Sequence, residues 1–210
     1  MIKILIADDH TLIREGLIKL LTSNFPDYTF GEAEDSSMVM EQIHKEDWDL
    51  LILDLNMPGR NGLDIIKDVK DYRPWIGIIV LSMYPEDQFA LRVIKAGASA
   101  YLTKATSSKV LIKAIEKVLK GSQFITGSVS KIMTDELRNE SKKPMHKTLS
   151  NRELQVLLLI ASGKNISDIA LELSLSVKTI SVYRAKILEK MNLKNNAEIT
   201  HYAFKNGLVE

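Results

Sequence analysis

The sequence contains no cysteine, which excludes disulfide bonds and metal sites built on thiolates. It contains no apolar run of membrane-spanning length, and no signal peptide precedes the strand-like segment that follows Met1. Neither an internal repeat nor a low-complexity tract is present. From these absences we expect a cytoplasmic protein that has no membrane partner.

Length, composition and charge bound the kind of protein. A chain of 210 residues suggests one or two domains, and a hydrophobic content of 45% is ordinary for a globular protein. The net charge of +1 hides a gradient, because residues 1–127 carry −3, residues 128–147 carry +2 and residues 148–210 carry +2. This gradient is a weak indication that the two halves have different partners.

Short apolar runs alternate with helical patterns over the first 120 residues. Strict alternation predicts parallel strands joined by right-handed helical crossovers, and therefore an α/β domain. The spacing of Leu12, Ile13, Leu17, Leu20 and Leu21 predicts a buried helix face. The predicted strands lie at 2–7, 28–33, 49–55, 76–82 and 99–102, and the predicted helices at 11–22, 36–46, 61–72, 86–97 and 107–120.

The second half of the chain follows a different pattern. Residues 128–147 are polar and charged, which indicates a linker with a short helix at 129–139. From residue 148 onward all patterns are helical, with helices predicted at 151–162, 166–173, 177–191 and 195–206. We therefore expect a first domain at 1–122, a linker at 123–147 and a small all-α domain of four helices at 148–210.

Polar side chains follow four of the five predicted strands. Asp8 and Asp9 follow the first strand and Asp54 follows the third. Ser82 ends the fourth strand, and Lys104 follows the fifth. The carboxyl ends of parallel strands open onto one edge of a sheet, where ligands bind. We therefore expect three carboxylates, a hydroxyl and an ammonium group in one cleft.

Each of these side chains also has an ordinary structural explanation. Asp9 could cap the helix that begins near Thr11, and Asp54 could start the turn that follows it. Ser82 could be an ordinary loop residue, and Lys104 a solvated surface lysine. Taken together these explanations are poor, because the positions fall at the ends of four different strands.

The clustered carboxylates limit which ions and reactions this cleft can support. Three carboxylates raise one another's pKa values unless a cation compensates them, and Mg²⁺ is a hard ion that takes oxygen ligands. Lys104 supplies a compact positive charge for a phosphoryl oxygen. The carboxylate of Asp54, central in the sheet, can itself act as a nucleophile and form an aspartyl phosphate.

Asp8-Asp9, the stretch D54-L-N-M-P-G59, Ser82 and Lys104 together resemble the receiver domain of two-component response regulators. The resemblance covers about residues 1–122. It implies a doubly wound, flavodoxin-like sheet of five parallel strands in the order 2-1-3-4-5. Family members often have proline after the lysine, where this chain has Ala105.

The resemblance also implies a role for each residue at the cleft. Asp54 would accept a phosphoryl group from a sensor histidine kinase, and Ser82, Lys104 and Tyr101 would respond to it. Tyr101 would turn inward as the switch aromatic, although its position alone indicates only a half-buried strand residue. The implied Mg²⁺ ligands are Asp8, Asp9, Asp54 and the backbone carbonyl of Asn56.

A helix-turn-helix is indicated within the all-α domain. Asn165 followed by Asp168 is a variant of the capping box and predicts the start of a short helix. Ser176 is a candidate N-cap for a longer helix after a tight turn. In that longer helix Ile180, Ile187, Leu188 and Met191 share one face and are expected to be buried.

The opposite face of the longer helix is small and partly cationic, which suits entry into a DNA major groove. A helical docking module with merely solvated basic residues explains the same pattern. The face consists of Lys178, Ser181, Val182 and Ala185, and the residues within reach of phosphates are Thr179, Arg184, Lys186 and Lys190.

Residues 148–210 resemble the LuxR-type DNA-binding domain. The landmarks are L149-S-x-R152-E153, G163, I169-A170, L175-S176 and T179-I-S. The resemblance places the base contacts at Ser181, Val182 and Ala185. Ser181 stands where many relatives have lysine and Tyr183 where many have histidine, so the preferred DNA sequence is expected to differ. The two halves together resemble the NarL/FixJ class of response regulators.

The sequence thus predicts a transcription factor, not an enzyme, that is switched by Mg²⁺-dependent phosphorylation of Asp54. Phosphorylation by a histidine kinase would promote homodimerisation and binding to double-stranded promoter DNA. Two rival hypotheses remain. One is a phosphohydrolase, which would need a second acid at the position of Asn56. The other is a constitutive DNA-binding or adaptor protein with a silent receiver, for which five matched cleft residues are not needed.

Overall fold

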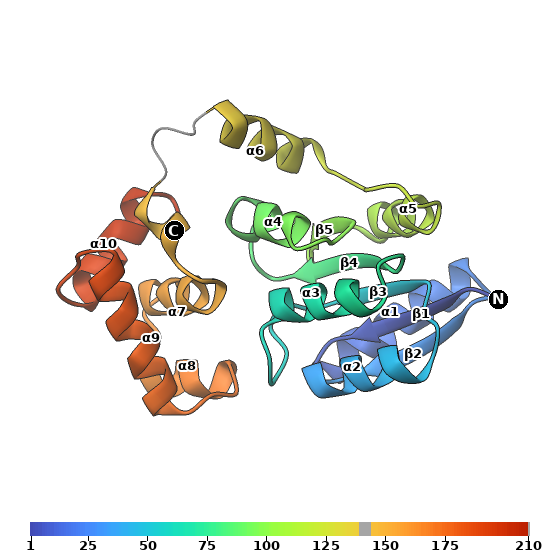
Figure 1. The fold of residues 1–210 in the computed structure, drawn as a ribbon, viewed down its shortest axis with the longest axis horizontal. Helices are drawn as coiled ribbons and strands as arrows, with labels where there is room; N and C mark the ends of the chain where they lie inside the picture. Colours follow the sequence, from blue (N-terminus) through green and yellow to red (C-terminus); the bar gives the residue numbers. More distant parts are fainter. Residues whose placement is uncertain (139–143, 210) are drawn as a thin grey trace. The chain divides into compact units, whose positions relative to one another are not determined.

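The computed structural model describes residues 1–138 and 144–209. The chain divides into two compact units, Met1–Leu137 and Arg138–Glu210, which are drawn in Figure 1 and are treated separately here. The first unit extends beyond the predicted domain end at residue 122, because the following segment packs against it. The predicted boundaries at 122 and 147 stay a prediction.

The first unit is built on one parallel sheet in the order β2-β1-β3-β4-β5 (Figure 1). This order confirms the predicted doubly wound fold. The register pairs Ala7 with Leu53, so β1 and β3 end level with one another, and it pairs Leu53 with Val80, so β4 runs two residues further, to Ser82. The strands are β1 (Lys3–Ala7), β2 (Thr29–Ala33), β3 (Leu50–Leu53), β4 (Gly77–Ser82) and β5 (Ala100–Thr103).

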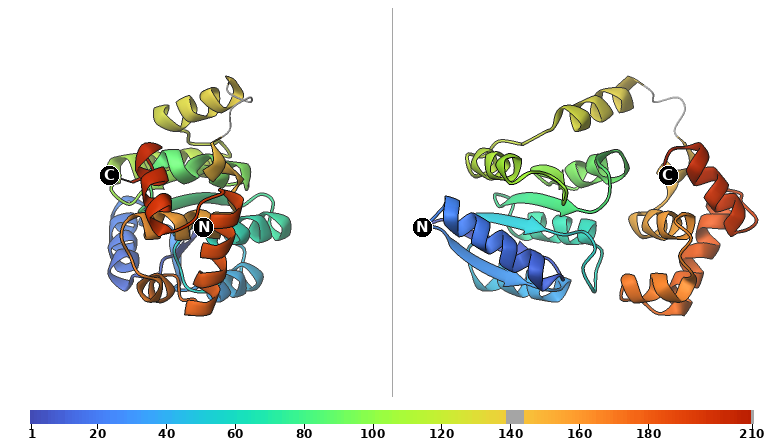
Figure 2. Two further views of the ribbon diagram at one scale, coloured as in Figure 1. Left: turned by 90° about the vertical axis from the view of Figure 1, so that its left-hand side faces the viewer. Right: turned by 180° about the vertical axis from the view of Figure 1, so that it is seen from behind.

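Helices cover both faces of this sheet (Figures 1 and 2). On one face Ile4, Ile6 and Ile52 pack with Leu21 of α1 and Ile115 of α5 in a continuous apolar core. Every residue of β3 and β4 is buried, as the apolar runs predicted. The helices are α1 (Thr11–Asn24), α2 (Ser36–Lys45), α3 (Gly62–Tyr72), α4 (Glu86–Lys95) and α5 (Ser108–Leu119).

One residue that was predicted to lie on the buried face of α1 is exposed instead. Leu12 is 83% exposed, whereas Leu21 and Arg14 are buried. Leu12 and Leu21 are nine positions apart, about two and a half helical turns, so they lie on opposite sides of the helix. The inward position in the first turns belongs to Arg14, whose guanidinium binds the Asp8 carbonyl. The prediction of a buried Leu12 is therefore wrong.

The segment after α5 returns to the first unit instead of leaving it. Phe124 pairs with Ala100 at the edge of the sheet, and its N–H donates to the Ser99 carbonyl at 2.9 Å. Helix α6 (Gly127–Arg138) follows, close to the predicted helix at 129–139. Part of the predicted linker is therefore bound to the sheet edge and α4, and residues 139–143 of that linker lie outside the described residues.

The second unit is all-α, and its helices match the predicted ones to within a residue or two. Asn165 and Ser176 cap α8 and α9 as predicted, by accepting the amides of Asp168 and Thr179 at 3.0 Å each. Ile180, Ile187 and Met191 are fully buried, as predicted, whereas Leu188 is only half-buried. The elements are η1 (Met145–Thr148), α7 (Asn151–Ala161), α8 (Ile166–Glu172), α9 (Val177–Lys190) and α10 (Asn196–Lys205).

Among the helices described above, none combines the length and hydrophobicity that crossing a bilayer requires.

Candidate functional site

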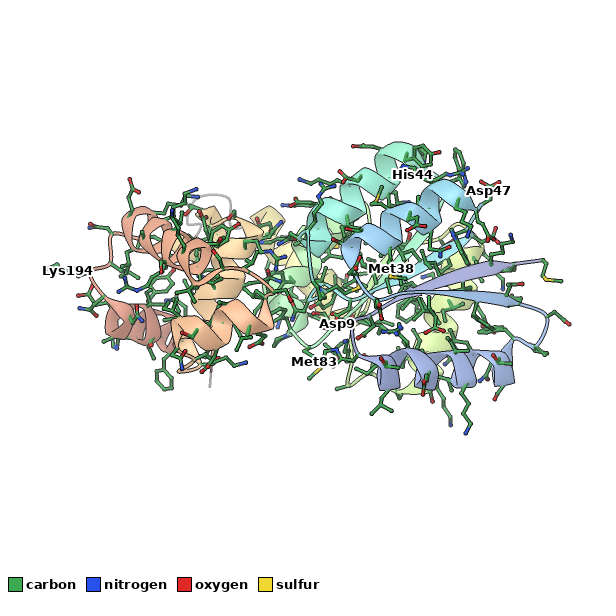
Figure 3. The ribbon with its side chains drawn as sticks, turned by 90° about the horizontal axis from the view of Figure 1, so that it is seen from below. Asp9, Met38, His44, Asp47, Met83 and Lys194 are labelled. Carbon is green, nitrogen blue, oxygen red and sulfur yellow. The ribbon has the colours of Figure 1, made fainter. Side chains whose placement is uncertain are left out.

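Three carboxylates and an imidazole meet at the carboxyl edge of the sheet. Asp8, Asp9 and His10 follow β1 and Asp54 follows β3, and one ligand atom of each lies within 4.8 Å of the others. Asp8 and Asp54 are each only 2% exposed, although both carry an ionisable group. Figure 3 shows Asp9 at the same end of the sheet as Met83, which follows β4.

Lys104 closes this cluster from the end of β5. Its Nζ lies 2.6 Å from Oδ2 of Asp8 and 2.8 Å from Oδ2 of Asp54, and its side chain is 8% exposed. The alternative of a solvated surface lysine is therefore wrong. Burial alone would lower the pKa of Lys104, but the carboxylates of Asp54 and Asp8 raise it above its usual value.

Asp54 is positioned by the sheet on one side and by a turn on the other. Its N–H donates to the Ala7 carbonyl at 2.8 Å, and its Oδ1 accepts the amide of Asn56 at 3.3 Å. The carboxylate therefore starts a turn and also faces the cluster. Burial raises the pKa of Asp54, and the ammonium of Lys104 offsets only part of this rise. Positive charge placed near Asp54 therefore stabilises the ionised form of its carboxylate.

Ser82 and Tyr101 lie inside the unit on β4 and β5. Ser82 is fully buried, and its Oγ accepts the amide of Tyr84 at 3.2 Å. Tyr101 is 1% exposed, so it is more deeply buried than expected for a half-buried strand aromatic. Its hydroxyl donates to the Tyr84 carbonyl at 2.7 Å, and burial raises its pKa far above the usual value. The loop after β4 is therefore tied to both residues.

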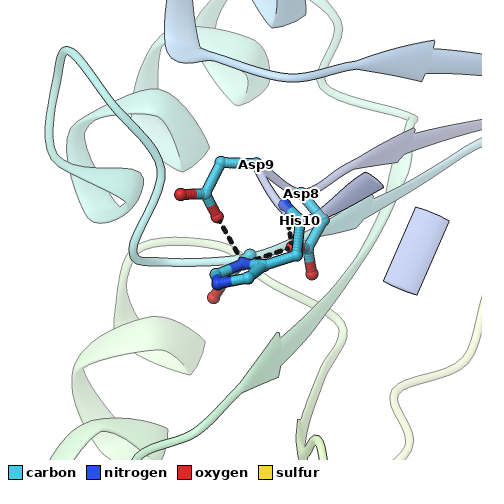
Figure 4. A group of neighbouring side chains, drawn as sticks. Asp8, Asp9 and His10 are labelled. Carbon is cyan, nitrogen blue, oxygen red and sulfur yellow. Dashed lines mark hydrogen bonds and ion pairs between the residues drawn. The ribbon is translucent and has the colours of Figure 1, made fainter. Parts of the chain in front are cut away.

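Asp9 does not cap α1. The N-cap of this helix is His10, and no side-chain hydrogen bond caps it. Instead the backbone N–H of His10 donates to Oδ1 of Asp8 at 2.9 Å (Figure 4). The capping alternative for Asp9 is therefore wrong, and its carboxylate remains at the mouth of the cluster.

In the second unit, most of the predicted DNA contacts lie on the accessible side of α9. Val182 is 47% exposed, so its apolar side chain is accessible on the surface of α9. Thr179 is half-buried, and its hydroxyl shares a 2.8 Å hydrogen bond with Ser176. The exposed positions are Lys178, Ser181, Val182, Ala185, Lys186 and Lys190.

Two of the predicted phosphate contacts already have protein partners. Arg184 Nε donates to Oδ1 of Asn196 on α10 at 2.5 Å, and Arg184 is half-buried. Lys190 Nζ lies 2.7 Å from Oε2 and 3.0 Å from Oε1 of Glu153 on α7. Both side chains therefore hold the helices of this unit together, and their contact with DNA stays a prediction.

Comparison with known proteins decides the family. Residues 4–116 match the model of the response regulator receiver domain, and residues 147–203 match that of the luxR family of bacterial regulatory proteins. This chain is a response regulator of the NarL/FixJ class. Because both matched segments coincide with the two sites described above, the response regulator combines a receiver with a LuxR-type helix-turn-helix unit.

Relatives of the response regulator cover nearly its full length. It is 30% identical over 209 residues to the response regulator UvrY of Escherichia coli K12, covering 99% of this chain and 96% of UvrY. It is 33% identical over 216 residues to the oxygen regulatory protein NreC of Staphylococcus epidermidis RP62A, covering 99% of both.

A solved structure of RcsB from Salmonella enterica serovar Typhimurium, bound to the promoter rprA with the phosphomimetic BeF3−, is also similar. The identity is 29% and the TM-score is 0.64, and the match covers 96% of this chain and 98% of that one.

The donor set of the response regulator's acidic cluster fits a hard divalent cation. The carboxylates of Asp8, Asp9 and Asp54 supply oxygens, and the carbonyl of Asn56 lies two residues after Asp54 in the chain. Such oxygens suit Mg²⁺, which keeps several waters when few protein ligands hold it. A bound cation would also compensate the burial of Asp54, whose pKa is raised in its absence.

Sequence reasoning missed Arg14 and gave His10 no role. The Nη1 of Arg14 donates to the carbonyl of Asp8 at 2.7 Å, and its Nε donates to Glu32 at 3.0 Å, so it anchors the loop that carries the acidic pair. Its position on the same helix face as Leu21 was the available signal. For His10 the signal was its place directly after the two aspartates.

Proposed function

We propose that this response regulator is a promoter-binding transcription regulator switched by phosphorylation of Asp54. One observation carries the proposal: a buried carboxylate at the end of the central strand β3 faces a buried lysine and a second buried carboxylate. A divalent cation and Lys104 would together offset the negative charge of these carboxylates and of a phosphoryl group on Asp54. The donor is a phosphohistidine of a sensor histidine kinase.

The transfer needs little chemistry from the protein beyond positioning. A carboxylate oxygen of Asp54 attacks phosphorus, the P–O bond forms as the P–N bond breaks, and the imidazole leaves with the bonding pair and takes a proton. Lys104 lies 2.8 Å from the attacking group and neutralises the phosphoryl oxygens. Mg²⁺, held by Asp8, Asp9, Asp54 and the carbonyl of Asn56, supplies further positive charge when bound.

The switch follows from the loop after β4. A phosphoryl group on Asp54 offers new acceptors to the hydroxyl of Ser82, whose Oγ now accepts the amide of Tyr84. Movement of Ser82 would release that amide and shift the carbonyl of Tyr84 that Tyr101 holds. Phosphorylation then favours a pre-existing alternative arrangement, in which the receiver forms a homodimer.

The DNA-binding step uses α9. Its exposed face, with Lys178, Ser181, Val182 and Ala185, enters the major groove, while Lys186 contacts a phosphate. Thr179, Arg184 and Lys190 would add phosphate contacts. Support comes from the solved RcsB structure bound to a promoter. A protein that binds promoter DNA works where that DNA is, so we expect a cytoplasmic location.

We propose no catalytic turnover beyond slow loss of the phosphoryl group from Asp54. The phosphohydrolase alternative would need a second acid, and Asn56 occupies that position. The alternative of a silent receiver is disfavoured because Lys104 directly contacts Asp54 and Asp8. A protein without a phosphorylation switch has no need of this buried charge cluster.

The test treats the full chain with Mg²⁺ and a small phosphodonor. Intact-mass spectrometry should show one added phosphoryl group, and sedimentation and DNA titration should show a dimer with higher promoter affinity. Asp54→Ala should abolish all three responses, whereas Asp64→Ala, an exposed aspartate on α3, should leave them intact. An Asp54→Ala protein that responds as strongly as the wild type refutes the proposal.

A further inference from the structure

His10 lies between the acidic pair and solvent, and neither the fold nor the phosphoryl transfer accounts for its side chain. Its Nδ1 lies 2.8 Å from Oδ1 of Asp9 and 3.2 Å from Oδ1 of Asp8 (Figure 4). Its side chain is 63% exposed, so it is free to adjust to an ion without disturbing the core. Its backbone is fixed by the 2.9 Å hydrogen bond from its N–H to Asp8.

These spacings match those of neighbouring ligands around a metal ion. In an octahedron with bonds of about 2.1 Å, adjacent ligand atoms lie about 3.0 Å apart. Imidazole nitrogen suits the ions of zinc, copper, iron and nickel better than it suits Mg²⁺. We propose that His10 is an additional ligand at the metal site, through which the response regulator binds transition-metal ions with a nitrogen in the coordination shell. This proposal rests on the metal site of the proposed function.

Mn²⁺ is the probe because it is paramagnetic. Pulsed electron paramagnetic resonance of the full chain with Mn²⁺ should show coupling to an imidazole nitrogen, and the coupling should change with ¹⁵N-labelled histidine. His10→Ala should remove the coupling and weaken Mn²⁺ binding by about tenfold, the lower end of effects at metal sites. Mg²⁺ affinity should stay within twofold. His44→Ala, an exposed histidine on α2, is the matched control and should change neither measurement.

The possible outcomes separate this proposal from the one on which it rests. Mn²⁺ that binds with oxygen and water couplings only, and equally well to His10→Ala, overturns the role of His10 and leaves the phosphorylation switch standing. Absence of any bound Mn²⁺, or binding that survives Asp9→Asn unchanged, overturns the metal site itself and the role of His10 with it.

A second inference rests independently on Glu86, the first residue of α4. Its carboxylate accepts the hydroxyl of Thr126 at 3.0 Å through both oxygens and also accepts the hydroxyl of Ser128 at the start of α6. Glu86 is two residues from Tyr84, which is bound to Ser82 and Tyr101. The segment from Ser82 to Glu86 therefore contacts both the phosphoacceptor side of the receiver and the start of α6.

The packing of α6 on this surface is incomplete. An open groove of about 570 Å³ remains between α6 and the start of α4, lined by residues such as Pro85, Asp87 and Lys131. Val129 is buried, and Glu136 lies 3.8 Å from Lys95. We infer that α6 is a latch, held on α4 by Glu86 while Asp54 is unphosphorylated and freed when Ser82 and Tyr84 rearrange. This inference too rests on the proposed function.

Hydrogen exchange measured by mass spectrometry tests the latch on the full chain with Mg²⁺. BeF3− should raise exchange in α6 several-fold. Glu86→Ala should raise it without BeF3− and leave little further response. Asp87→Ala, which removes a charge from the same helical turn and lines the same groove, should behave like the wild type.

Exchange in the loops after β3 and β4 reports separately whether BeF3− has bound. If those loops respond and α6 does not, or if Glu86→Ala matches Asp87→Ala, the latch is refuted. If the loops do not respond, the phosphorylation switch fails, and the latch fails with it.

Discussion

Lys104→Met tests how much the folded state depends on the ammonium group that lies between the buried carboxylates of Asp8 and Asp54. The substitution leaves two carboxylates, Asp8 and Asp54, each 2% exposed and without the ammonium that lies 2.6 Å and 2.8 Å from them. Removing one partner of a buried ion pair costs about 3–5 kcal/mol. Protonation of one carboxylate relieves part of this cost. We therefore expect a loss of about 3 kcal/mol in the free energy of unfolding when metal ions are absent.

Urea denaturation with a chelator present measures this loss. Both tryptophans, Trp48 and Trp75, lie in the first unit, so their fluorescence follows that unit alone. With a slope of about 2 kcal/mol per molar urea, the midpoint should fall by about 1.5 M. Lys109→Met, an exposed lysine on α5, is the control and should shift the midpoint little.

The pH dependence gives a second test of the same reasoning. The pKa of Asp54 is already raised by burial in the wild type, and loss of Lys104 should raise it further. A raised pKa means that the folded state binds the proton more tightly, so stability increases as the pH falls through that pKa and decreases as the pH rises. The deficit of Lys104→Met should therefore shrink on acidification. A midpoint within 0.2 M of the wild type, or a deficit that grows at lower pH, refutes the reasoning.

Three further predictions concern the second unit. Ser176→Ala should lower its free energy of unfolding by about 1 kcal/mol, because the capped amide at the start of α9 loses its acceptor. Burial raises the pKa of Glu153, but bonds from Lys190 and Ser150 outweigh burial and lower it, so its contribution exists above the unfolded pKa and is lost on acidification. Lys190→Met should therefore cost about 1 kcal/mol at neutral pH and little in acid. Lys186→Ala should weaken binding to all DNA sequences alike and reduce the salt slope by about 1.

Each of these has its own check. Thermal denaturation of Ser176→Asp, which keeps an acceptor, should restore what Ser176→Ala loses. Circular dichroism between neutral and acid pH should show the curves of Lys190→Met and wild type converging, and parallel curves contradict the ion-pair argument. For DNA, Lys205→Ala at the end of α10 is the control, and an effect of Lys186→Ala confined to one sequence contradicts a phosphate contact.

Much of the fold could be predicted because the patterns are local. The alternation of apolar runs and helical periods predicts each of the five strands, and the helices α1 to α5 that connect and follow them, to within a few residues. The cap residues Asn165 and Ser176 mark helix starts correctly, since a cap acts over three residues. The meeting of Asp8, Asp54 and Lys104 follows from parallel strands alone, because all their carboxyl ends share one edge.

The rest depends on contacts between distant residues. Leu12 looks like a core residue until Arg14 is known to take the inward position toward Asp8. Lys190 looks like a free cation, but Glu153, 37 positions away, binds it. Neither the helical nor the strand period of a sequence predicts contacts between residues that are so far apart in the chain. The attachment of the segment after α5 depends likewise on Ala100 and Glu86, which are remote in sequence.

The capped helices of the second unit have a consequence for the order of folding. Each of its four α-helices begins with a side chain that accepts an amide, at Ser150, Asn165, Ser176 and Asn195. By contrast, the edge of the sheet that carries the acidic cluster requires β1 to pair with β3, and the pairing of Ile4 with Leu50 closes a long loop. Folding slows as contacts become less local. A refolding chain should therefore regain α9 well before it assembles the cluster of Asp8, Asp54 and Lys104.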